Sequence, residues 1–329
     1  MKDFTQLSRT DWIKLIEEFN TTLYNSVTGL TRKQWNRRTP YLGWRVRDVM
    51  ANITRAKVVN FHPSLDRALD DYPIAPKEFD TFLRCQREVE ARRHVSIGVL
   101  LDEFMTESDY LLDRYRHMSD EDFLKPGWFF VGPLNVRGLL LTEFGDNVFH
   151  LRDMLQPNGK WQGFDPSYSE PLVDWFMREY RPAHFRADRA DHIHARIQYR
   201  LSGVGGGTWT MRIVNNRCIM SQGAHHDYDA VIESSAEDMV STALGRTSPW
   251  LGSLARSMDW FAGVNRKSDV VAAILHYGSY ADAFKHRRFR FMGDRDLGMF
   301  VNRKCFWHFY QRTSMTHERI SQSRGVVWC

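Results

Sequence analysis

Apolar residues recur with the period of a helix through the first 155 residues of the chain. In the first such stretch they fall at i, i+3, i+4, i+7 and i+11, as Trp12, Leu15, Ile16, Phe19 and Leu23. This spacing places them along one face of an amphipathic helix. Thr10 or Asp11 is a suitable N-cap residue for that helix.

The same period returns around residues 44–53, 95–115 and 134–154. Residues 60–90 are polar and contain several prolines, and residues 127–133 are rich in turn formers, so both segments are predicted to be irregular connections. Four long helices joined by loops of mixed length are typical of a four-helix bundle.

The pattern changes after Gln156, where proline and glycine indicate a linker and a short helix follows around 170–179. From His192 onward apolar and polar residues alternate, which predicts β-strands. Further strands are expected at 208–214, 218–220 and 230–232, with turns at Gly203–Gly207 and Asn215–Asn216. Helical spacing returns at 237–244, 250–258 and 267–275. A meander followed by helices predicts an α+β domain.

The expected fold class is therefore α + (α+β), a helical bundle followed by an α+β domain with a five-stranded sheet. We expect the bundle to span residues 1–156, a linker with a short helix 157–191, and the α+β domain 192–275. Residues 276–329 are expected to form a basic, aromatic extension that packs on the second domain.

Composition narrows the class of protein. The chain has 329 residues, of which 43% are hydrophobic and 26% charged, as in ordinary globular proteins. Mean hydropathy is −0.48, and apolar stretches such as 95–101 are far too short to cross a bilayer. Four scattered cysteines without a CxxC pair argue against a disulfide framework and a cysteine zinc site. No secretory leader is recognisable, so we expect a soluble, cytoplasmic protein without a membrane partner.

The net charge of +5 is concentrated at the end of the chain. If residues 285–291 form a strand, Arg288 and Arg290 share one face, and Phe289 and Phe291 the other. The two arginines could bind carboxylates of a substrate or thiol cofactor. The alternative is an edge strand whose charges oppose aggregation, and we favour it slightly. Nothing else along the chain supports binding of nucleic acid.

The last predicted helix of the bundle carries three polar residues that are candidates for metal binding or catalysis. Asp146, His150 and Asp153 are spaced four and three apart, which places them on one helical face. A carboxylate and an imidazole at this spacing can chelate one divalent metal inside a bundle. The same spacing also suits an ordinary polar face with a hydrogen bond between residues i and i+4.

Two stretches resemble the DinB-like family, in its branch of mycothiol-dependent maleylpyruvate isomerases. They are Gly43–Asn52, with Trp35 and Thr39-Pro40 upstream, and Glu143–Met154. The resemblance covers about residues 8 to 156. It implies a four-helix bundle that holds a divalent metal, commonly zinc, through a His at the end of the first stretch and a carboxylate and a His in the second. The metal activates a thiol or water.

Carried onto this chain, the metal ligands would be Asn52, Asp146 and His150, with zinc or nickel as the ion. The chain departs from the family at Asn52, where the His is expected, and an amide oxygen is a poor zinc ligand. Three outcomes stay open. Asn52 is a weak ligand, or another residue such as His62 supplies the donor, or the site is metal-free and Asp146 and His150 act as an acid/base pair. Asp153 could support the site as a partner of its ligands.

Residues 192–275 resemble a sterol carrier protein type two domain through Tyr199–Gly203, Asp229–Asp238 and Leu244–Pro249. The resemblance implies a five-stranded sheet packed by helices, which encloses an apolar tunnel in the carrier members. The fusion with a DinB-like bundle occurs in the isomerase branch, where the second domain helps wall the active site. Gly263-Val264-Asn265 stands where the family has Gly-Asp.

The resulting hypothesis is a small-molecule enzyme that uses a low-molecular-weight thiol for isomerisation or S-transfer. Asp146 and His150 would lower the thiol pKa, Asn52 would orient the substrate, and Arg288 and Arg290 would bind carboxylates. One alternative is a metal-free enzyme of specialised metabolism that catalyses a cyclisation or rearrangement. Another is a non-catalytic binder of an apolar ligand. The partner is expected to be an anionic or partly apolar small molecule, and the protein a monomer or homodimer.

Overall fold

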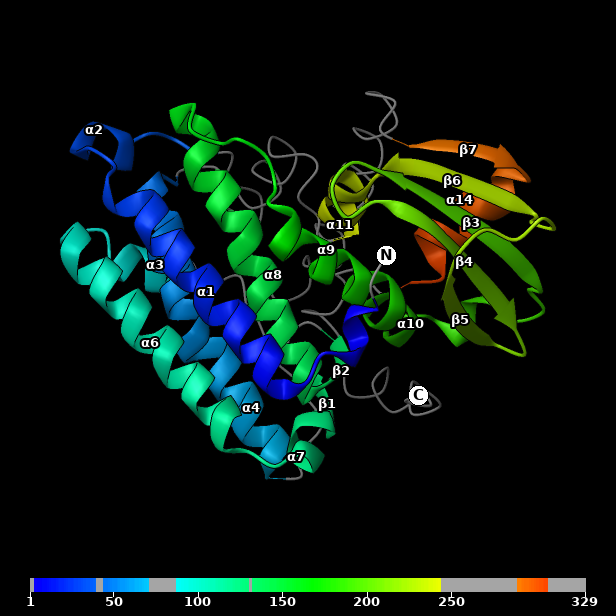
Figure 1. Cartoon of the computed structure of the whole chain (residues 1–329), viewed down its shortest axis with the longest axis horizontal. Coiled ribbons are helices and arrows are strands. Elements are labelled where there is room, and N and C mark those ends of the chain that lie inside the picture. Colours follow the sequence, from blue (N-terminus) through cyan, green and yellow to red (C-terminus); the bar gives the residue numbers. More distant parts are fainter. Residues whose placement is uncertain (1–2, 40–43, 71–86, 130–131, 244–288, 307–329) are drawn as a thin grey trace. The chain divides into compact units, whose positions relative to one another are not determined.

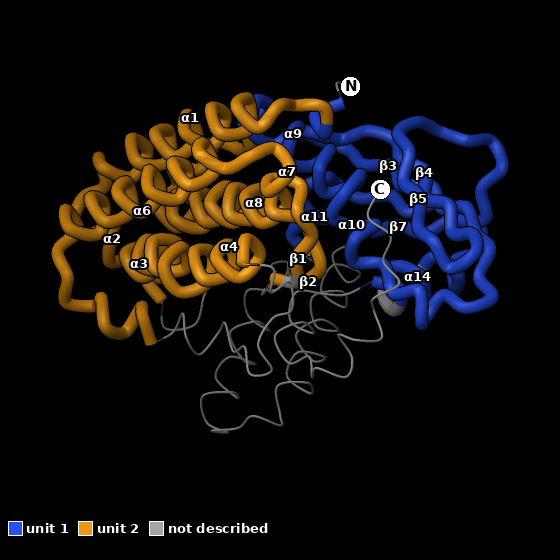
Figure 2. Tube along the Cα trace, turned by 90° about the horizontal axis from the view of Figure 1, so that it is seen from below, with its two compact units in different colours: residues 1–5, 165–329 blue, residues 6–164 orange. Residues whose placement is uncertain are grey.

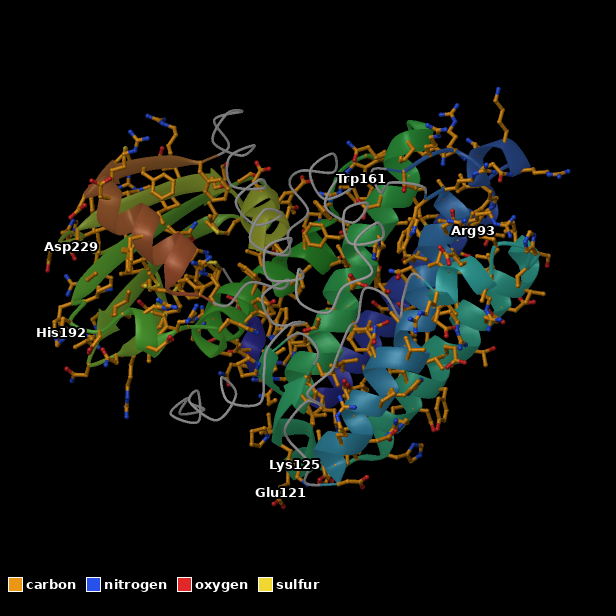
Figure 3. All side chains as sticks on the ribbon, turned by 180° about the vertical axis from the view of Figure 1, so that it is seen from behind. Arg93, Glu121, Lys125, Trp161, His192 and Asp229 are labelled. Atoms are coloured by element: carbon orange, nitrogen blue, oxygen red, sulfur yellow. The ribbon has the colours of Figure 1, made fainter. Side chains whose placement is uncertain are left out.

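The structure is a computed structural model that describes residues 3–39, 44–70, 87–129, 132–243 and 289–306. The chain divides into two compact units (Figure 2). One unit comprises residues 6–164, here the helical unit, and the other residues 1–5 and 165–329, here the sheet unit. A mixture of helix and sheet was predicted and is confirmed.

The helical unit is built from long helices and a small hairpin (Figure 1). Helix α1 packs against α6 and α8, and α3 packs against the same two helices, so the four surround a common core. The elements, in chain order, are α1 (Arg9–Thr28), α2 (Arg32–Trp35), α3 (Val46–Ala56), the π-helical turn η2 (Lys57–Phe61), α4 (His62–Leu69), α6 (Ile97–His117), α7 (Asp120–Leu124), β1 (Pro126–Phe129), β2 (Gly132–Asn135), α8 (Val136–Leu155) and the 3₁₀ turn η3 (Gln156–Asn158).

Helix α1 follows its predicted apolar face, since Trp12, Ile16, Phe19 and Leu23 are buried. Its predicted N-cap is wrong. Ser8 caps the helix through its hydroxyl, and Asp11 completes a capping box as the third helical residue. Two backbone N–H groups are thereby satisfied.

Helix α8 is buried on nearly all sides because it contacts α1, α3, α4, α7 and the β1–β2 hairpin. Polar side chains on such a helix must find partners inside the protein, since an unpaired buried polar group is costly. Helix α8 carries four buried polar residues, Glu143, Asn147, His150 and Asp153.

Two segments differ from their predicted form. The region expected to be irregular contains α4, which continues from α3 through η2. The predicted turn-rich connection at 127–133 contains β1 and β2, which pair antiparallel. Helix α4 has eight residues and each strand four, so none of these elements is long enough to show a clear period.

A proline explains each of the two π-helical turns. Pro63 follows η2 by two residues, and Pro182 likewise follows η4 (Phe176–Tyr180). Proline lacks an N–H group, and its ring clashes with the carbonyl four residues earlier. The wider turn relieves that clash. The residue before each proline then bonds one position further back, His62 to the Lys57 carbonyl and Arg181 to the Phe176 carbonyl.

The sheet unit carries a five-stranded sheet in the order β5-β4-β3-β6-β7. Strands β3, β4 and β5 form the predicted meander, and β6 then pairs parallel with β3. The unit's elements are α9 (Pro166–Trp175), η4, α10 (Arg181–Ala183), η5 (Ala187–Arg189), β3 (Ala195–Ser202), β4 (Gly207–Val214), β5 (Arg217–Gln222), β6 (Ala230–Ser235), α11 (Ala236–Ala243), β7 (Arg290–Gly293) and α14 (Arg295–Lys304). The 3₁₀ turn η1 (Phe4–Gln6) precedes α1.

The alternation in β3 sorts its side chains between the two faces of the sheet. Ile197 and Tyr199 are fully buried, and Tyr199 pairs with Trp209 of β4 and Ile232 of β6. The predicted turn at Asn215–Asn216 is confirmed, because both residues adopt positive φ as a type I′ hairpin turn requires.

Strand β7 lies at the edge of the sheet. Arg290 is exposed there and forms an ion pair with Glu233 of β6, with 3.4 Å between Nη1 and Oε2. Arg288, the helices expected at 250–258 and 267–275, and Gly263–Asn265 lie outside the described residues. No helix in the described part of the chain is long and apolar enough to span a bilayer.

Candidate active site

Helices α3 and α8 bring three of the predicted site residues together. Asn52 lies on α3, and Asp146 and His150 lie one turn apart on α8. The Nδ2 atom of Asn52 lies 3.3 Å from Nε2 of His150, and Oδ1 of Asp146 lies 3.5 Å from the same nitrogen. The imidazole Nε2 is therefore the centre of the cluster.

The other ring nitrogen of His150 faces a second carboxylate. Nδ1 lies 3.3 Å from Oδ2 of Asp153, and the other oxygen of Asp153 accepts a hydrogen bond from Nη2 of Arg152 at 3.2 Å. Carboxylates lie beside both ring nitrogens, and the nearer and more deeply buried one, Asp153, favours the tautomer with its proton on Nδ1. We assign that tautomer to His150, which leaves Nε2 as the basic nitrogen.

Burial separates the two sides of the imidazole. The side chains of His150 and Asp153 are 4% and 3% exposed, whereas that of Asp146 is 29% exposed. Solvent thus meets the cluster at Asp146, on the Nε2 side. The arrangement can take up a proton at Nε2 from a group that approaches past Asp146, while Asp153 stabilises the resulting imidazolium.

The geometry is compatible with part of a metal site. Two ligands of a tetrahedral zinc ion lie about 3.4 Å apart, and Nε2 of His150 and Oδ1 of Asp146 are separated by 3.5 Å. The amide of Asn52 presents Nδ2 to the imidazole, and its Oδ1 is buried without a hydrogen-bond partner. A half-turn of the amide would bring Oδ1 to the position that Nδ2 now occupies, beside Nε2 of His150. The residues thus fit a divalent metal with two strong donors and one weak one.

Asp153 does not join that donor set, because the imidazole ring lies between it and Asp146. Among the described residues, no group of three or more His, Cys, Asp and Glu side chains is arranged to hold a metal. Of the three polar residues on one face of α8, His150 therefore lies in the middle, with Asp146 on its Nε2 side and Asp153 on its Nδ1 side.

His62, the other candidate ligand, lies in a different cluster. Its Nε2 faces Oε2 of Glu107 at 3.4 Å, its Nδ1 faces Arg114 at 3.5 Å, and its ring packs on Tyr110. Burial, together with the nearby Arg114 charge, lowers the pKa of His62 below its ordinary value. Through these contacts His62 links α4, to which it belongs, to α6.

A buried ion pair on α8 was not predicted. Nζ of Lys57 in η2 lies 2.9 Å from Oε1 of Glu143, and both side chains are almost fully buried. Lys57 also lies over the ring of Phe104. Asn147 donates to Glu143 at 2.6 Å and to Asn20 of α1 at 3.2 Å. A charged residue that follows the apolar run Leu139–Leu141 in this helix was the available signal, but the sequence does not identify its partner.

Glu143 acts on one further group. Burial, and secondarily the charge of Glu143, raises the pKa of Tyr115 far above its usual range. Tyr115 is therefore neutral and contributes no charge to the interior of the unit.

No protein-family model matches the chain, and no curated protein matches it in sequence. Among solved structures, the chain is similar to a mutant of the mycothiol-dependent maleylpyruvate isomerase, with a TM-score of 0.50 and 12% identity over 75% of this chain and 93% of that one. A structure of the mycothiol-dependent maleylpyruvate isomerase without that mutation gives a TM-score of 0.49 and 11% identity over the same shares of the two chains. Identity this low reports on the fold alone. The chain is thus similar in fold to a mycothiol-dependent maleylpyruvate isomerase.

Proposed function

We propose that the protein is a thiol-dependent enzyme of small-molecule metabolism, an isomerase or S-transferase, with its active site at His150. One observation carries this proposal. A buried imidazole has the carboxylate of Asp153 3.3 Å from its Nδ1, and its Nε2 faces Asn52 and the partly exposed Asp146. Such a pairing makes Nε2 a general base of fixed orientation.

In the proposed reaction, Nε2 of His150 takes the proton of a bound thiol. The thiolate then adds to one carbon of a conjugated C=C bond of the substrate, and the π electron pair moves onto the adjoining carbonyl as an enolate. In an isomerisation, rotation about the resulting single bond is followed by return of the electron pair, which re-forms the C=C bond and expels the thiolate, and the proton returns from His150 to the sulfur. In an S-transfer the thiolate instead displaces a leaving group, which departs with the bonding pair. The Nδ2 group of Asn52 donates to Nε2 in the resting state and turns to the substrate when Nε2 is protonated.

If a divalent metal is bound, Asn52, Asp146 and His150 would hold it, and it would supply a lower pKa for a coordinated thiol. Asp153 would then keep the His150 ring oriented toward the ligand point, as partners of metal-bound histidines do.

We further assign the helical unit to the DinB-like four-helix bundles and the sheet unit to the sterol-carrier-like domains. The boundaries near 156, 191 and 275 belong to this assignment. The proposed partner is an anionic or partly apolar small molecule, with Arg288 and Arg290 as candidate contacts to its carboxylates. We propose a cytoplasmic monomer or homodimer.

The test of this function is thiolate formation on the protein. The ultraviolet absorbance of mycothiol and of glutathione is titrated with pH in the presence of the full chain. A bound thiol should ionise at least one unit of pH below the free thiol, and His150→Gln should abolish the effect. His117→Gln is the matched control, because His117 is exposed on α6 of the same unit. A thiol that ionises as in free solution would contradict the proposal.

Isomerisation of maleylpyruvate with either thiol, followed by proton NMR, tests the reaction itself. We expect turnover with one of the two thiols and none with His150→Gln. Thiolate formation without turnover would favour S-transfer over isomerisation.

A second candidate is a metal-free enzyme that catalyses a rearrangement. The hydrogen bond from Asn52 to Nε2 of His150 favours it, because that bond occupies the nitrogen lone pair a metal needs. Elemental analysis of protein purified without a histidine tag, beside the Asn52→His variant, separates the two. About one zinc or nickel per chain in the native protein supports a metal site. Metal in the variant alone supports the metal-free candidate.

A further inference from the structure

A buried cation lies in the core of the sheet unit. Arg181, the first residue of α10, is only 5% exposed. Its Nη2 donates to the hydroxyl of Tyr199 and to Oδ1 of Asn302, both at 2.9 Å. The guanidinium also lies 4.8 Å from the ring centre of Tyr199 and 4.2 Å from that of Phe306. It is thus held between β3, α14 and the segment after α14.

The partners of Arg181 carry no negative charge. They are a hydroxyl, an amide and the sulfur of Met239, and no carboxylate of the described residues is within ion-pair distance. Burial raises the pKa of Tyr199 to about 12 and that of Cys218, which also senses the charge of Arg181, to about 12, so both groups are neutral near pH 7. A buried charge without a counter-charge is strongly unfavourable.

Two buried donors in this region also have no acceptor. Nε of Arg181 and Nε1 of Trp209 are buried without a hydrogen-bond partner. Trp209 is the cross-strand neighbour of Tyr199, so the two side chains share one face of the sheet. Unused donors on the same face of the sheet as a cation with no carboxylate partner among the described residues call for an acceptor with negative charge.

The neighbouring Arg178 provides the contrast. Its Nε donates to the buried carboxylate of Asp174 at 2.9 Å, and its Nη2 donates to Gln222 at 2.7 Å. It too lies over an aromatic ring, that of Trp209. Arg178 therefore has a counter-charge, whereas Arg181, three residues further on, has none among the residues that the structure describes.

We propose that Arg181 binds the carboxylate of an organic acid inside the sheet unit. The surrounding aromatic rings and the thioether of Met239 suit a ligand whose body is apolar. A guanidinium forms charge-assisted hydrogen bonds with a carboxylate, and a carboxylate accepts from several donors at once. This site is independent of the thiol chemistry proposed for the helical unit.

Benzoate and its neutral counterpart benzamide test the site on the full chain. Calorimetric titration and thermal unfolding are measured with each compound. We expect benzoate to bind and to raise the Tm in a concentration-dependent manner, since a ligand of the folded state stabilises it. Benzamide should have little effect. No response to benzoate, or an equal response to both compounds, would overturn the proposal.

Variants at the two arginines separate ligand binding from a structural role. Arg181→Met should weaken benzoate binding about ten- to hundredfold, the range of a hydrogen bond to a charged group. Without ligand its Tm should equal or exceed that of the native protein, because the variant removes a buried charge that has no carboxylate partner in the described part of the chain. Arg178→Met should lower the Tm and leave benzoate binding unchanged. Equal loss of stability in the two variants, with unchanged benzoate binding, would show Arg181 to be structural.

Arg181→Lys is the second variant if Arg181→Met does not fold. It keeps the charge but loses the planar array of donors. We expect it to fold and to bind benzoate about tenfold more weakly. Native affinity in Arg181→Lys would overturn the assignment of the guanidinium as the binding group.

Discussion

The behaviour of His150 follows from what lies at each edge of its ring. Asp153 faces Nδ1, and Arg152 in turn donates to Asp153 and lies over Phe149. This chain of contacts holds the imidazole in one orientation. The resemblance to maleylpyruvate isomerases predicted that Asn52, Asp146 and His150 would lie together, and the structure places them so. The placement of Asp153 on the opposite ring edge could not be predicted, because helical spacing gives a shared face but not a side-chain direction.

The tautomer of His150 can be measured directly. We expect two-bond nitrogen–proton correlations in NMR to show the ring proton on Nδ1. Asp153→Asn should shift the population toward the Nε2 proton and reduce thiol-dependent turnover about 100-fold or more. Asp146→Asn is the control, since its carboxylate lies at Nε2 and its loss should leave the proton on Nδ1. A ring proton on Nε2 in the native protein would contradict our assignment.

His62 should make stability depend on pH. Its pKa in the folded state is lowered by burial and by Arg114, so the unfolded chain binds a proton more readily. As far as His62 is concerned, the free energy of unfolding is highest above the unfolded pKa of about 6.5 and decreases as the pH falls below that value.

Urea unfolding at about pH 7.5 and about pH 5.5 measures this dependence. The loss of stability on acidification should be smaller in His62→Gln than in the native protein. His117→Gln, which alters an exposed histidine, should keep the native dependence. The same loss in all three proteins would exclude His62 as its source.

At the level of elements, the sequence predicts best where apolar residues repeat over several turns. Helices α1, α6 and α8 and the strands β3 and β4 lie close to their predicted positions for this reason. Helix α4 was missed because fewer than two turns follow Pro63, and η2 separates their period from that of α3. Strand β6 was predicted, but its parallel pairing with β3 was not, since the order of strands depends on long-range packing.

The Lys57–Glu143 pair joins η2 to α8, and breaking it should have a large effect on the free energy of unfolding. Lys57→Met should lower the free energy of unfolding by about 3–5 kcal/mol, because Glu143 keeps a buried charge without its partner. The double variant Lys57→Met/Glu143→Gln should recover part of that loss, since both charges are removed. Guanidinium unfolding measures the two changes.

Lys14→Met provides the control for that experiment. Lys14 is exposed, and its Nζ lies 4.0 Å from Oε1 of Glu18. Its loss should change stability by less than about 1 kcal/mol. A similar effect for Lys14→Met and Lys57→Met would contradict the importance of the buried pair.

The molecule as a whole has two compact units, each with its own buried core. The sites argued above belong to different units, His150 to the helical unit and Arg181 to the sheet unit. A ligand that binds one folded unit stabilises that unit first. The division into a helical and a mixed part was visible in the change of period after Gln156. The sequence could not show which charged residues would be enclosed.

Scanning calorimetry of the full chain tests this division. We expect two unfolding transitions, of which benzoate raises only one and Lys57→Met lowers only the other. Arg178→Met should lower the transition that benzoate raises, which assigns it to the sheet unit. A single transition that responds to every change would mean that the units unfold together.

The π-helical turn at Lys57–Phe61 also decides how this chain can change length. Such a turn holds one residue more than a turn of α-helix, so removal of one residue from η2 would restore regular geometry and leave α4 in its present rotation. His62 would keep its place opposite Glu107 and Arg114, and Asn52, which precedes the turn, its place opposite His150. The ring of Pro63 would again meet the carbonyl four residues earlier. A single-residue deletion here should therefore lower stability through Pro63 and spare both the α4–α6 contact and the active site. The wide turn thus absorbs one residue of chain length without changing the direction of the side chains that follow it.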